Sequence, residues 1–374
     1  MRILFLSHTS RRSVFRVGSH HLAREFAGRG HRVVHLSNPL SVAHLARLSD
    51  DEVRRRARMA VPLRLHPIDG ALFGVPWSVF PLTPDPLGRP LTLGSTRLLR
   101  NALRRADCLD PDLVLVDQPL LSHLIEPLGA RAVVYRPTDL HTGGQALEAQ
   151  RRLLQRADGV IATSQTVLDP LLAQGFGGPT AVVPNGVDLE LFGSADAAAA
   201  GTARRGAVYV GALDGRFDWD AVAAVARAAP NEPVDVHGPG PGSRPALPPN
   251  VVVHGPVDYA RVPGILAAHR VGLLPLNDDP TNEGRSPMKL FEYLAAGLAV
   301  VARATPALTA HRLTDVHTYR SAGDAGDAFR AAVAAPPSPA GRAAAATMSW
   351  GSRAELVLDA ATAMAAGRPV AVPG

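Results

Sequence analysis

The chain has 374 residues, 46% of them hydrophobic and 19% charged, which is enough for about two globular domains with their own cores. No apolar run reaches the ~20 residues of a membrane span, and a single cysteine, Cys108, excludes intrachain disulfides and cysteine-based metal sites. The formal net charge is +6, but the arginines are spread along the chain and aromatic residues make up only 5%, which argues against a nucleic-acid-binding protein.

Strand-like and helix-like segments alternate through the first half of the chain. Residues 1–8 are predicted to form an apolar strand that is too short for a signal-peptide core, so we expect a cytoplasmic protein. A helix is predicted from Gly18 to Arg29, and the segment 60–95, rich in Pro and Gly, is predicted to form irregular loops. Further helices are predicted at 42–59, 95–106 and 148–157. Further strands are predicted at 33–36, 113–116, 132–135, 159–163 and 181–183.

The segment 193–206 has low complexity, with four consecutive alanines, and is the best candidate for a linker. The alternation of strand-like and helix-like segments resumes after it and ends in a helix predicted at 353–366. Strands of the second half are predicted at 207–210, 233–236, 251–253, 271–274 and 298–301. Such alternation predicts an α/β protein with mainly parallel sheets, and two units of this kind are expected to form a cleft where ligands bind.

Lys289 is the only lysine among the 39 basic residues. A GC-rich coding bias, which replaces lysine with arginine, accounts for the excess of arginine but leaves open why this position keeps a lysine. An ammonium is a compact point charge, whereas a guanidinium is a wide planar fork, and a tight phosphate site can require the former. Considered alone, this lysine fits accident and function equally well.

The neighbours of Lys289 favour a function. Ser286 is predicted to be the N-cap, and Pro287 the first residue, of a helix that Gly297 ends. Lys289 then lies in the first turn, where free backbone N–H groups and the positive end of the helix dipole suit a di- or triphosphate. Glu292, one turn later on the same face, is suited to bind the hydroxyls of a ribose. The alternative is an exposed Lys–Glu pair worth a few tenths of a kcal/mol.

Other candidate sites carry weaker signals. Gly18 opens the first helix, so its backbone N–H group could meet a phosphate, or the segment could be an ordinary turn from strand to helix. Arg216, in the loop after the strand 207–210, could brace a diphosphate or lie exposed on the surface. The segment 237–242 imitates a glycine-rich phosphate loop, but the prolines between its glycines favour a simple turn.

Several of these residues lie in motifs that resemble those of GT-B glycosyltransferases of the GT4-like superfamily. The motifs are the segment 183–188 (Val-Pro-Asn-Gly-Val-Asp) and the segment 287–297 around Lys289. The segments 15–22 and 211–219 resemble a bacterial subgroup that includes glucuronosyltransferases of polysaccharide assembly. The resemblance spans both halves of the chain.

The resemblance implies two Rossmann-like domains that face a cleft, with a nucleotide-sugar donor held mainly by the second. The expected parts are an acceptor-side domain (1–192), a linker (193–206), a donor-binding domain (207–345) and a C-terminal helical segment that crosses back to the first domain (346–374). Lys289 is implied to bind the diphosphate and Glu292 the ribose. The remaining donor-binding residues expected are Gly18, Arg216, Val257, Ser286, Pro287, Met288 and Leu290. The histidines expected on the acceptor side are His8, His20 and His21, each of which also fits a structural role.

One position departs from the resemblance and bears on the mechanism. Many retaining members carry a glutamate eight residues before the ribose-binding one, where this chain has Gly284. The subgroup that the chain resembles is inverting and takes its base from an aspartate of the first domain. Asp139 fits this role because it follows the strand 132–135, at the carboxyl end where α/β sites form. His141 is the competing base. On spacing alone, Asp139 also fits an Asx turn or a helix cap.

The leading hypothesis is a metal-independent glycosyltransferase without a cofactor. It would move a sugar, glucuronic acid by resemblance, from a UDP-sugar to a small-molecule or lipid-linked acceptor. The sequence contains no H-E-x-x-H motif, and the D-x-D sequence at 218–220 is predicted to be a helix cap. A lipid-linked acceptor would place the arginine-rich run 54–58 against an anionic membrane, although such a run is usually a solvated face. The alternatives are a nucleotide-sugar epimerase of the same fold and a non-catalytic nucleotide-sugar-binding partner subunit.

Overall fold

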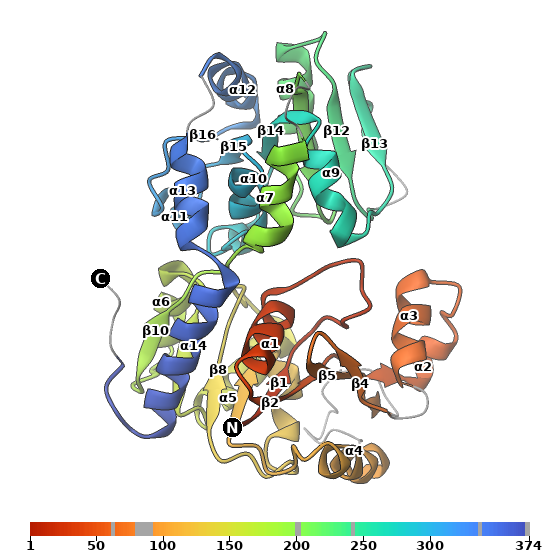
Figure 1. The fold of residues 1–374 in the computed structure, drawn as a ribbon, viewed down its shortest axis with the longest axis vertical. Coiled ribbons are helices and arrows are strands. Elements are labelled where there is room, and N and C mark those ends of the chain that lie inside the picture. Colours follow the sequence, from red (N-terminus) through yellow and green to blue (C-terminus); the bar gives the residue numbers. More distant parts are fainter. Residues whose placement is uncertain (61–63, 79–92, 199–202, 241–243, 336–338, 371–374) are drawn as a thin grey trace. The chain divides into compact units, whose positions relative to one another are not determined.

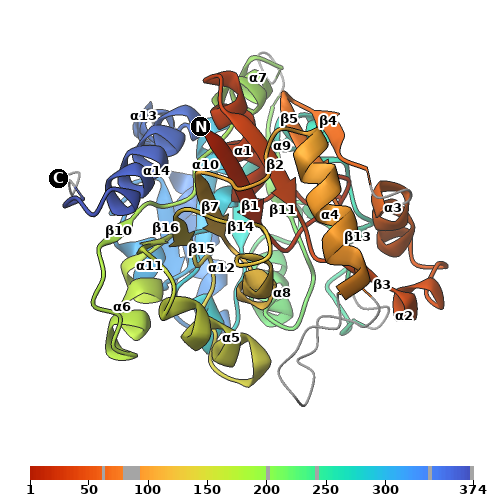
Figure 2. The same cartoon turned by 90° about the horizontal axis from the view of Figure 1, so that it is seen from below.

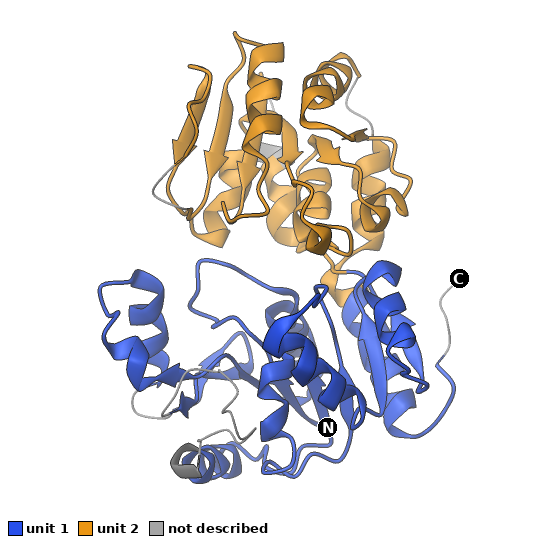
Figure 3. Ribbon diagram, turned by 180° about the vertical axis from the view of Figure 1, so that it is seen from behind, with its two compact units in different colours: residues 1–184, 353–374 blue, residues 185–352 orange. Residues whose placement is uncertain are grey.

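The structure is a computed structural model that describes residues 1–60, 64–78, 93–198, 203–240, 244–335 and 339–370. The chain forms two compact units (Figure 3). Unit 1 combines Met1–Pro184 with Arg353–Gly374, and unit 2 is Asn185–Ser352. The C-terminal segment therefore belongs to the same unit as the N-terminus.

Unit 1 is built on an eight-stranded sheet with the strand order β10-β9-β8-β7-β1-β2-β5-β4. The pairings along this order are parallel, except for the antiparallel pair of β4 and β5 at one edge. The strands are β1 (Arg2–Leu6), β2 (Arg32–Leu36), β4 (His66–Ile68), β5 (Ala71–Gly74), β7 (Leu113–Val116), β8 (Val133–Tyr135), β9 (Gly159–Ala162) and β10 (Thr180–Val182). Since the central strands run parallel, their carboxyl ends meet along one edge of the sheet.

Helices cover both faces of the unit 1 sheet because its strands alternate two sets of buried side chains. On one face, Leu4 and Leu6 join a core with α4 (Leu93–Arg105), α5 (Gly144–Leu154) and α6 (Gln165–Ala173). These three helices are labelled in Figure 2. On the other face, Phe5 stacks on Phe26 of α1 (Gly18–Gly28), with ring centroids 5.9 Å apart. The last helix, α14 (Trp350–Ala365), brings Met364 so close to Gly159 of β9 that a side chain at the glycine would clash.

Unit 2 is built on a six-stranded, parallel sheet with the strand order β13-β12-β11-β14-β15-β16 (Figure 1). Its strands are β11 (Arg205–Val210), β12 (Val234–His237), β13 (Val251–His254), β14 (His269–Leu274), β15 (Ala299–Arg303) and β16 (Val316–Tyr319). Val208 packs with α7 (Leu189–Ala198), α9 (Val262–Leu266), α10 (Met288–Ala295) and α13 (Pro339–Thr347). Its neighbours in sequence, Ala207 and Tyr209, pack with α8 (Trp219–Ala228) and α12 (Ala325–Ala334) on the other face.

The predicted alternation of parallel strands and helices is confirmed, but two of the predicted segments need correction. The helix predicted at 42–59 is two helices, α2 (Val42–Leu45) and α3 (Asp51–Ala60), because the Asp50 carboxylate accepts the Glu52 N–H at 2.8 Å and starts a new helix. The segment predicted as irregular loops contains β4 and β5, since Leu72 pairs with Val34 of β2; its residues 61–63 and 79–92 lie outside the described residues. Strand β16 was not predicted.

The two units divide earlier than the predicted linker at 193–206. The division falls between Pro184 and Asn185, and α7 already packs inside unit 2. The reason is local: Val187 donates its N–H to the Met348 carbonyl at 2.9 Å and accepts from Trp350 at 3.1 Å, which fastens this segment to unit 2. Residues 199–202 of the predicted linker lie outside the described residues.

Candidate functional site

The carboxyl end of β11 lies directly against Lys289. A Cβ atom added to Gly211, the residue after this strand, would come within 2.5 Å of Lys289 Cε and 2.5 Å of the Tyr209 hydroxyl oxygen. The Gly211 N–H donates to the His237 carbonyl at 2.9 Å. The Lys289 side chain therefore passes over Gly211, and a larger residue there would require the ends of the Lys289 and Tyr209 side chains to shift.

Lys289 is the second residue of α10 and is partly exposed. Burial lowers the pKa of its ammonium, the Glu292 carboxylate opposes that shift, and the Arg285 guanidinium adds to it. A cation that has lost hydration and faces a second cation gains free energy from an anionic partner. The surroundings of Lys289 thus suit a bound anion.

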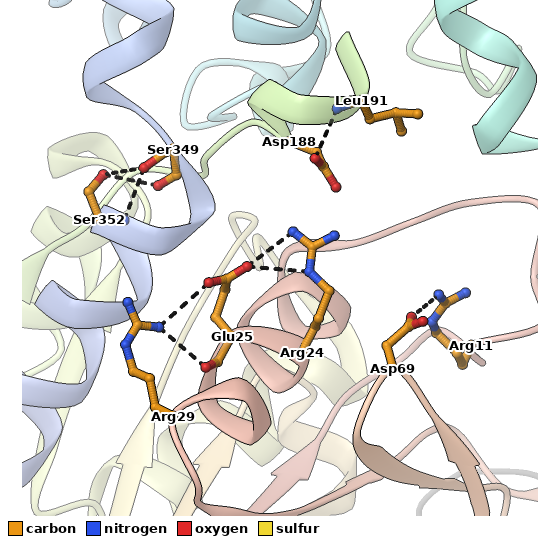
Figure 4. A network of polar contacts seen from close by, with 9 residues as sticks. All are labelled: Arg11, Arg24, Glu25, Arg29, Asp69, Asp188, Leu191, Ser349 and Ser352. Carbon is orange, nitrogen blue, oxygen red and sulfur yellow. Dashed lines mark hydrogen bonds and ion pairs between the residues drawn. The ribbon is translucent and has the colours of Figure 1, made fainter. Parts of the chain in front are cut away.

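Glu292 lies one turn further along α10 and is only 6% exposed. Its Oε1 accepts a hydrogen bond from the Tyr259 hydroxyl at 3.1 Å. Burial raises the pKa of the Glu292 carboxyl, while Lys289 and Tyr259 oppose the shift and Asp188 adds to it. Asp188 itself accepts the Leu191 N–H at 3.2 Å and caps the start of α7 (Figure 4). Tyr259 was not predicted, because it lies 33 residues away in sequence.

The start of α10 differs from the prediction. The N-cap residue is Pro287, and no side chain in the described part of the chain caps this turn. The hydroxyl of Ser286, the predicted cap, instead accepts the N–H of Asn185 at 3.1 Å, and the Ser286 carbonyl accepts the Asn185 side-chain amide at 2.9 Å. The first turn of α10 therefore keeps backbone N–H groups beside Lys289. Gly297 ends the helix with φ +75°, as predicted.

Arg216 follows β11 at some distance and is held in place by its own loop. Its Nη2 lies 2.7 Å from Asp214 Oδ2. Burial would raise the pKa of the Asp214 carboxyl, but hydrogen bonds from Arg216 and the charge of Arg285 outweigh it and lower that pKa. Arg216 thus has an internal carboxylate partner, and its role at a diphosphate stays a prediction. Arg285 was not predicted as a site residue, although its charge acts on both Lys289 and Asp214.

The other predicted donor-binding residues of unit 2 differ in exposure. Met288 and Pro287 are partly exposed at the start of α10, and Val257 is partly buried against the core on that side of the sheet. The Leu290 side chain is fully buried in the same core, so only its backbone could face a ligand. In the glycine-rich segment 237–242, Gly238 approaches the Gly211 carbonyl too closely for a side chain; residues 241–242 lie outside the described residues.

In unit 1, the structure brings Asp139 and His141 together with His8. Asp139 lies in a bend after β8, partly buried, and its Oδ2 accepts the Thr138 hydroxyl at 3.3 Å. Burial lowers the pKa of His141, the Asp139 carboxylate opposes this shift, and His8, which follows β1, adds to it. Asp139 does not cap the next helix, because the N-cap of α5 is Gly143.

The remaining predicted residues of unit 1 lie deeper in the fold. Gly18 is the buried first residue of α1. His20 and His21 are 3% and 4% exposed, so both lie inside unit 1. His20 Nε2 is 2.9 Å from the Thr9 carbonyl oxygen, and its ring centroid lies 4.9 Å from that of His35. These buried contacts support a structural role for His20, the alternative to a place on the acceptor side.

A buried polar network at the carboxyl edge of the unit 1 sheet was not predicted. Asp117 follows β7 and Arg136 follows β8, and their side chains, both 1% exposed, pair at 3.3 Å. Ser7 Oγ lies 2.9 Å from Ser19 Oγ and donates to Asp117 Oδ2 at 3.4 Å. His35 Nε2 lies 2.9 Å from Ser19 Oγ. The position of Asp117 directly after a buried strand was the signal that could have revealed the network.

The described residues contain neither a candidate metal site nor a helix that could span a membrane. No group of acidic, histidine or cysteine side chains in the described ranges could hold a metal ion. The sequence 218–220 is the predicted helix cap, since Asp218 accepts the Ala221 N–H at 2.9 Å at the start of α8. Among the residues described, no helix is both long and apolar enough to cross a membrane.

The comparisons with known proteins agree with this architecture. Residues 17–191 match the model of Glycosyltransferase Family 4, and residues 216–358 match a model described as Glycosyl transferase-like. A putative teichuronic acid biosynthesis glycosyltransferase, TuaH of Bacillus subtilis (strain 168), is 30% identical over 186 residues. This match covers 46% of the chain and 46% of TuaH, so it spans about half the length of that relative.

Solved structures with a similar fold cover almost the whole chain. Sucrose-phosphate synthase from Thermosynechococcus elongatus has a TM-score of 0.65 and 17% identity, with 96% of this chain and 97% of that chain covered. Anabaena HepE in complex with UDP and glucose has a TM-score of 0.66 and 14% identity, with 97% and 100% covered. A glycosyltransferase model therefore matches each half of the chain, and the chain shares the GT-B fold of these solved glycosyltransferases over almost its whole length.

Proposed function

We propose that the chain is a metal-independent glycosyltransferase that transfers a sugar from a UDP-sugar to a small-molecule or lipid-linked acceptor, with inversion. The observation that carries the proposal is the passage of Lys289 over Gly211 beside the uncapped first turn of α10. A lysine ammonium and backbone N–H groups at one point suit a diphosphate. The HepE structures, which hold UDP and UDP-glucose, support a uridine donor.

The chemistry divides between two sets of residues. The acceptor oxygen attacks the anomeric carbon, the bond from that carbon to the diphosphate oxygen breaks, and the UDP leaves with the negative charge. Lys289 and the amides of α10 would stabilise that charge in place of a metal. Asp139 would take the acceptor proton, with His141 as the competing base. The Glu292 carboxylate, oriented by the Tyr259 hydroxyl, would accept hydrogen bonds from the ribose hydroxyls.

A donor panel tests the proposal directly. Thermal unfolding is followed with UDP, GDP, ADP and their sugars, because a ligand that binds the folded state raises Tm in proportion to its affinity and concentration. We expect UDP-sugars, with UDP-glucuronic acid foremost, to raise Tm most, and Lys289→Met to remove the shift. Equal shifts for all the nucleotides, or an unchanged shift in Lys289→Met, would contradict the proposal.

The arginine-rich run 54–58 bears on the acceptor. Arg54 and Arg55 pair with Asp51 and Glu52 on the same helix, α3. Arg56 donates to the Pro39 carbonyl at 2.7 Å, and burial lowers the pKa of its guanidinium. These contacts reduce the positive charge available to a membrane and favour a small-molecule acceptor. Co-sedimentation with anionic liposomes tests this point: binding that is lost at high salt would favour a lipid-linked acceptor instead.

A further inference from the structure

Strand β11 pairs unequally with its two neighbours in the unit 2 sheet. With β12, the register continues to Val210, the last residue of the strand. With β14, the register ends at Val208 and Gly272, although β14 itself continues to Leu274. The strand order reverses at β11, because β12 and β13 follow on one side and β14 to β16 on the other. Ligands of α/β proteins bind in the crevice at such a reversal.

One backbone donor lies where β11 and β14 part. The N–H groups of a strand point alternately to its two neighbours. Gly211 donates to β12, so the N–H of Val210 points to β14. A longer ladder would give this N–H a carbonyl of β14 as its acceptor. Its acceptor is instead the hydroxyl oxygen of Tyr293, a residue of α10, at 3.1 Å. A buried backbone N–H needs a partner, and here a side chain supplies it.

Gly272 allows the Tyr293 ring to reach this position. A Cβ atom added to Gly272 would clash with Tyr293 Cδ2 and lie 2.5 Å from its Cγ. The ring therefore crosses β14 over the backbone of this glycine, and Tyr293 is 0% exposed. A glycine inside a strand often marks such a close approach. Because Cγ is joined to the helix through a single CH₂ group, a side chain at position 272 would push the ring and α10 away from the sheet.

The turn after β11 is held at three consecutive residues. Gly211 donates its N–H to β12 at 2.9 Å, and the Tyr209 hydroxyl donates to the carbonyl of the next residue at 2.8 Å. The residue before the glycine is held by Tyr293. This last contact comes from α10, the helix that also carries Lys289. It therefore ties Gly211 to the helix whose lysine passes over it.

We propose that Tyr293 is a positioning residue: its hydroxyl keeps the ends of β11 and β14 apart and holds Gly211 where the Lys289 side chain can pass over it. The inference rests on the proposed function, because it assigns the residue that directs the ammonium to the diphosphate of the donor. Without the hydroxyl, the N–H of Val210 would pair with a carbonyl of β14 and the strand ends would close. Lys289 would keep its charge and lose its position.

The chain offers a direct probe of this geometry, because Lys289 is its single lysine. In protein labelled with carbon-13 lysine, the ε-CH₂ group therefore gives one NMR signal. We expect this signal to shift in Tyr293→Phe, which keeps the ring and removes the hydroxyl, and in Gly272→Ala, which displaces the ring. Tyr135→Phe is the matched control in unit 1. It also removes a buried hydroxyl bond, to Gln150 at 2.9 Å, and should leave the signal in place.

The same signal reports donor binding when UDP is titrated into the full chain. We expect Tyr293→Phe to weaken the Kd for UDP by about tenfold, because a displaced ammonium forms a poorer charged hydrogen bond. Tyr135→Phe should bind UDP as the wild type does. The positioning role is overturned if the Lys289 signal is unchanged in Tyr293→Phe, or if the signal shifts and the Kd does not. A wild-type signal that does not respond to UDP would overturn the proposed donor site, and this inference with it, before any variant is made.

Discussion

The two units place polar groups at the carboxyl edge of a parallel sheet in opposite ways. In unit 1, the pair of Asp117 and Arg136 is 1% exposed and tied to further buried hydroxyls. In unit 2, Lys289 is partly exposed above a glycine, and the N-cap residue beside it, Pro287, makes no side-chain cap. The first arrangement pairs its two charges within the fold, whereas the second leaves backbone N–H donors for a ligand. Position at the strand ends therefore identifies candidates, and exposure distinguishes Lys289 from the buried pair of unit 1.

The largest effect is expected at the partly buried carboxylate of unit 1. Asp139→Asn removes the proposed base while keeping its shape, so turnover should fall by about 10²–10⁴ with the free energy of unfolding unchanged. Steady-state transfer assays and urea unfolding measure the two quantities. Asp169→Asn, at an exposed site on α6, is the matched control and should change neither. Unchanged turnover in Asp139→Asn would leave His141 as the base.

The buried neighbour Asp117 should behave in the opposite way. Asp117→Asn removes the carboxylate charge that pairs with the buried Arg136 guanidinium, which should cost about 3–5 kcal/mol of unfolding free energy. A double variant, Asp117→Leu with Arg136→Met, should cost less than the sum of the single changes, since no unpaired charge remains. Urea unfolding measures the cycle. Additive costs would mean that the two groups do not stabilise each other.

These two aspartates also mark the limit of what the sequence predicts. Both follow buried apolar strands, so the pattern of hydrophobic residues located them correctly at strand ends. Asp139 was predicted as a site residue because a resemblance pointed to it. Asp117 was not predicted to belong to a polar network. Its burial depends on the pair with Arg136, and local sequence patterns do not show a pairing between residues 19 positions apart.

The helix around Lys289 shows the same limit. Its periodic apolar residues and Gly297 predicted the helix and its end, and Lys289 and Glu292 fell on it as expected. The role of Ser286 was wrong, because its hydroxyl bonds to Asn185, 101 residues away in sequence. Local chemistry therefore predicted the elements and most of their residues. The contacts that choose among equally good local roles arise only in the folded chain.

Lys289 provides the test of unit 2 that corresponds to Asp139. Lys289→Met removes one charged donor to the leaving diphosphate, so turnover should fall by about 10²–10³, as for the loss of one preorganised donor. Lys289→Arg sharpens the test, since a wide guanidinium must pass the same glycine. The arginine guanidinium should clash at Gly211, so Lys289→Arg should recover little of the activity. Full activity in Lys289→Arg would mean that charge alone matters at this position.

The buried network of unit 1 should also make the chain sensitive to acid. Burial lowers the pKa of His35 to about 3, and the positive charge of His8 adds to the shift. Below pH 6.5 the unfolded chain binds a proton that the folded chain does not, so stability falls as the pH drops towards 3, by up to about 1.4 kcal/mol per pH unit. His35→Phe keeps a ring beside Phe5 and Phe73 without the titrating group.

We expect urea unfolding of His35→Phe to show a flatter dependence on pH between 6.5 and about 3 than the wild type. Some slope should remain, because burial also lowers the pKa of His20 well below its usual range. At pH 7.5 the variant should be less stable than the wild type, since Ser19 loses its contact with His35. Equal slopes would show that His35 gains protons as readily in the folded chain as in the unfolded one.

The smallest effect is expected at Tyr259, whose hydroxyl donates to Glu292 at 3.1 Å. Tyr259→Phe removes one hydrogen bond to this carboxyl, worth about 1.5–3 kcal/mol for a charged acceptor and less where it only orients a ligand group. The ribose lies far from the reacting bond, so the lost contact weakens substrate and transition state equally. KM for the donor should rise with kcat unchanged.

The hydrogen bond from Tyr259 also lowers the pKa of Glu292. Its loss raises that pKa further, so the increase in KM should grow as the pH falls. A fall in kcat at constant KM would instead place Glu292 at the reacting sugar.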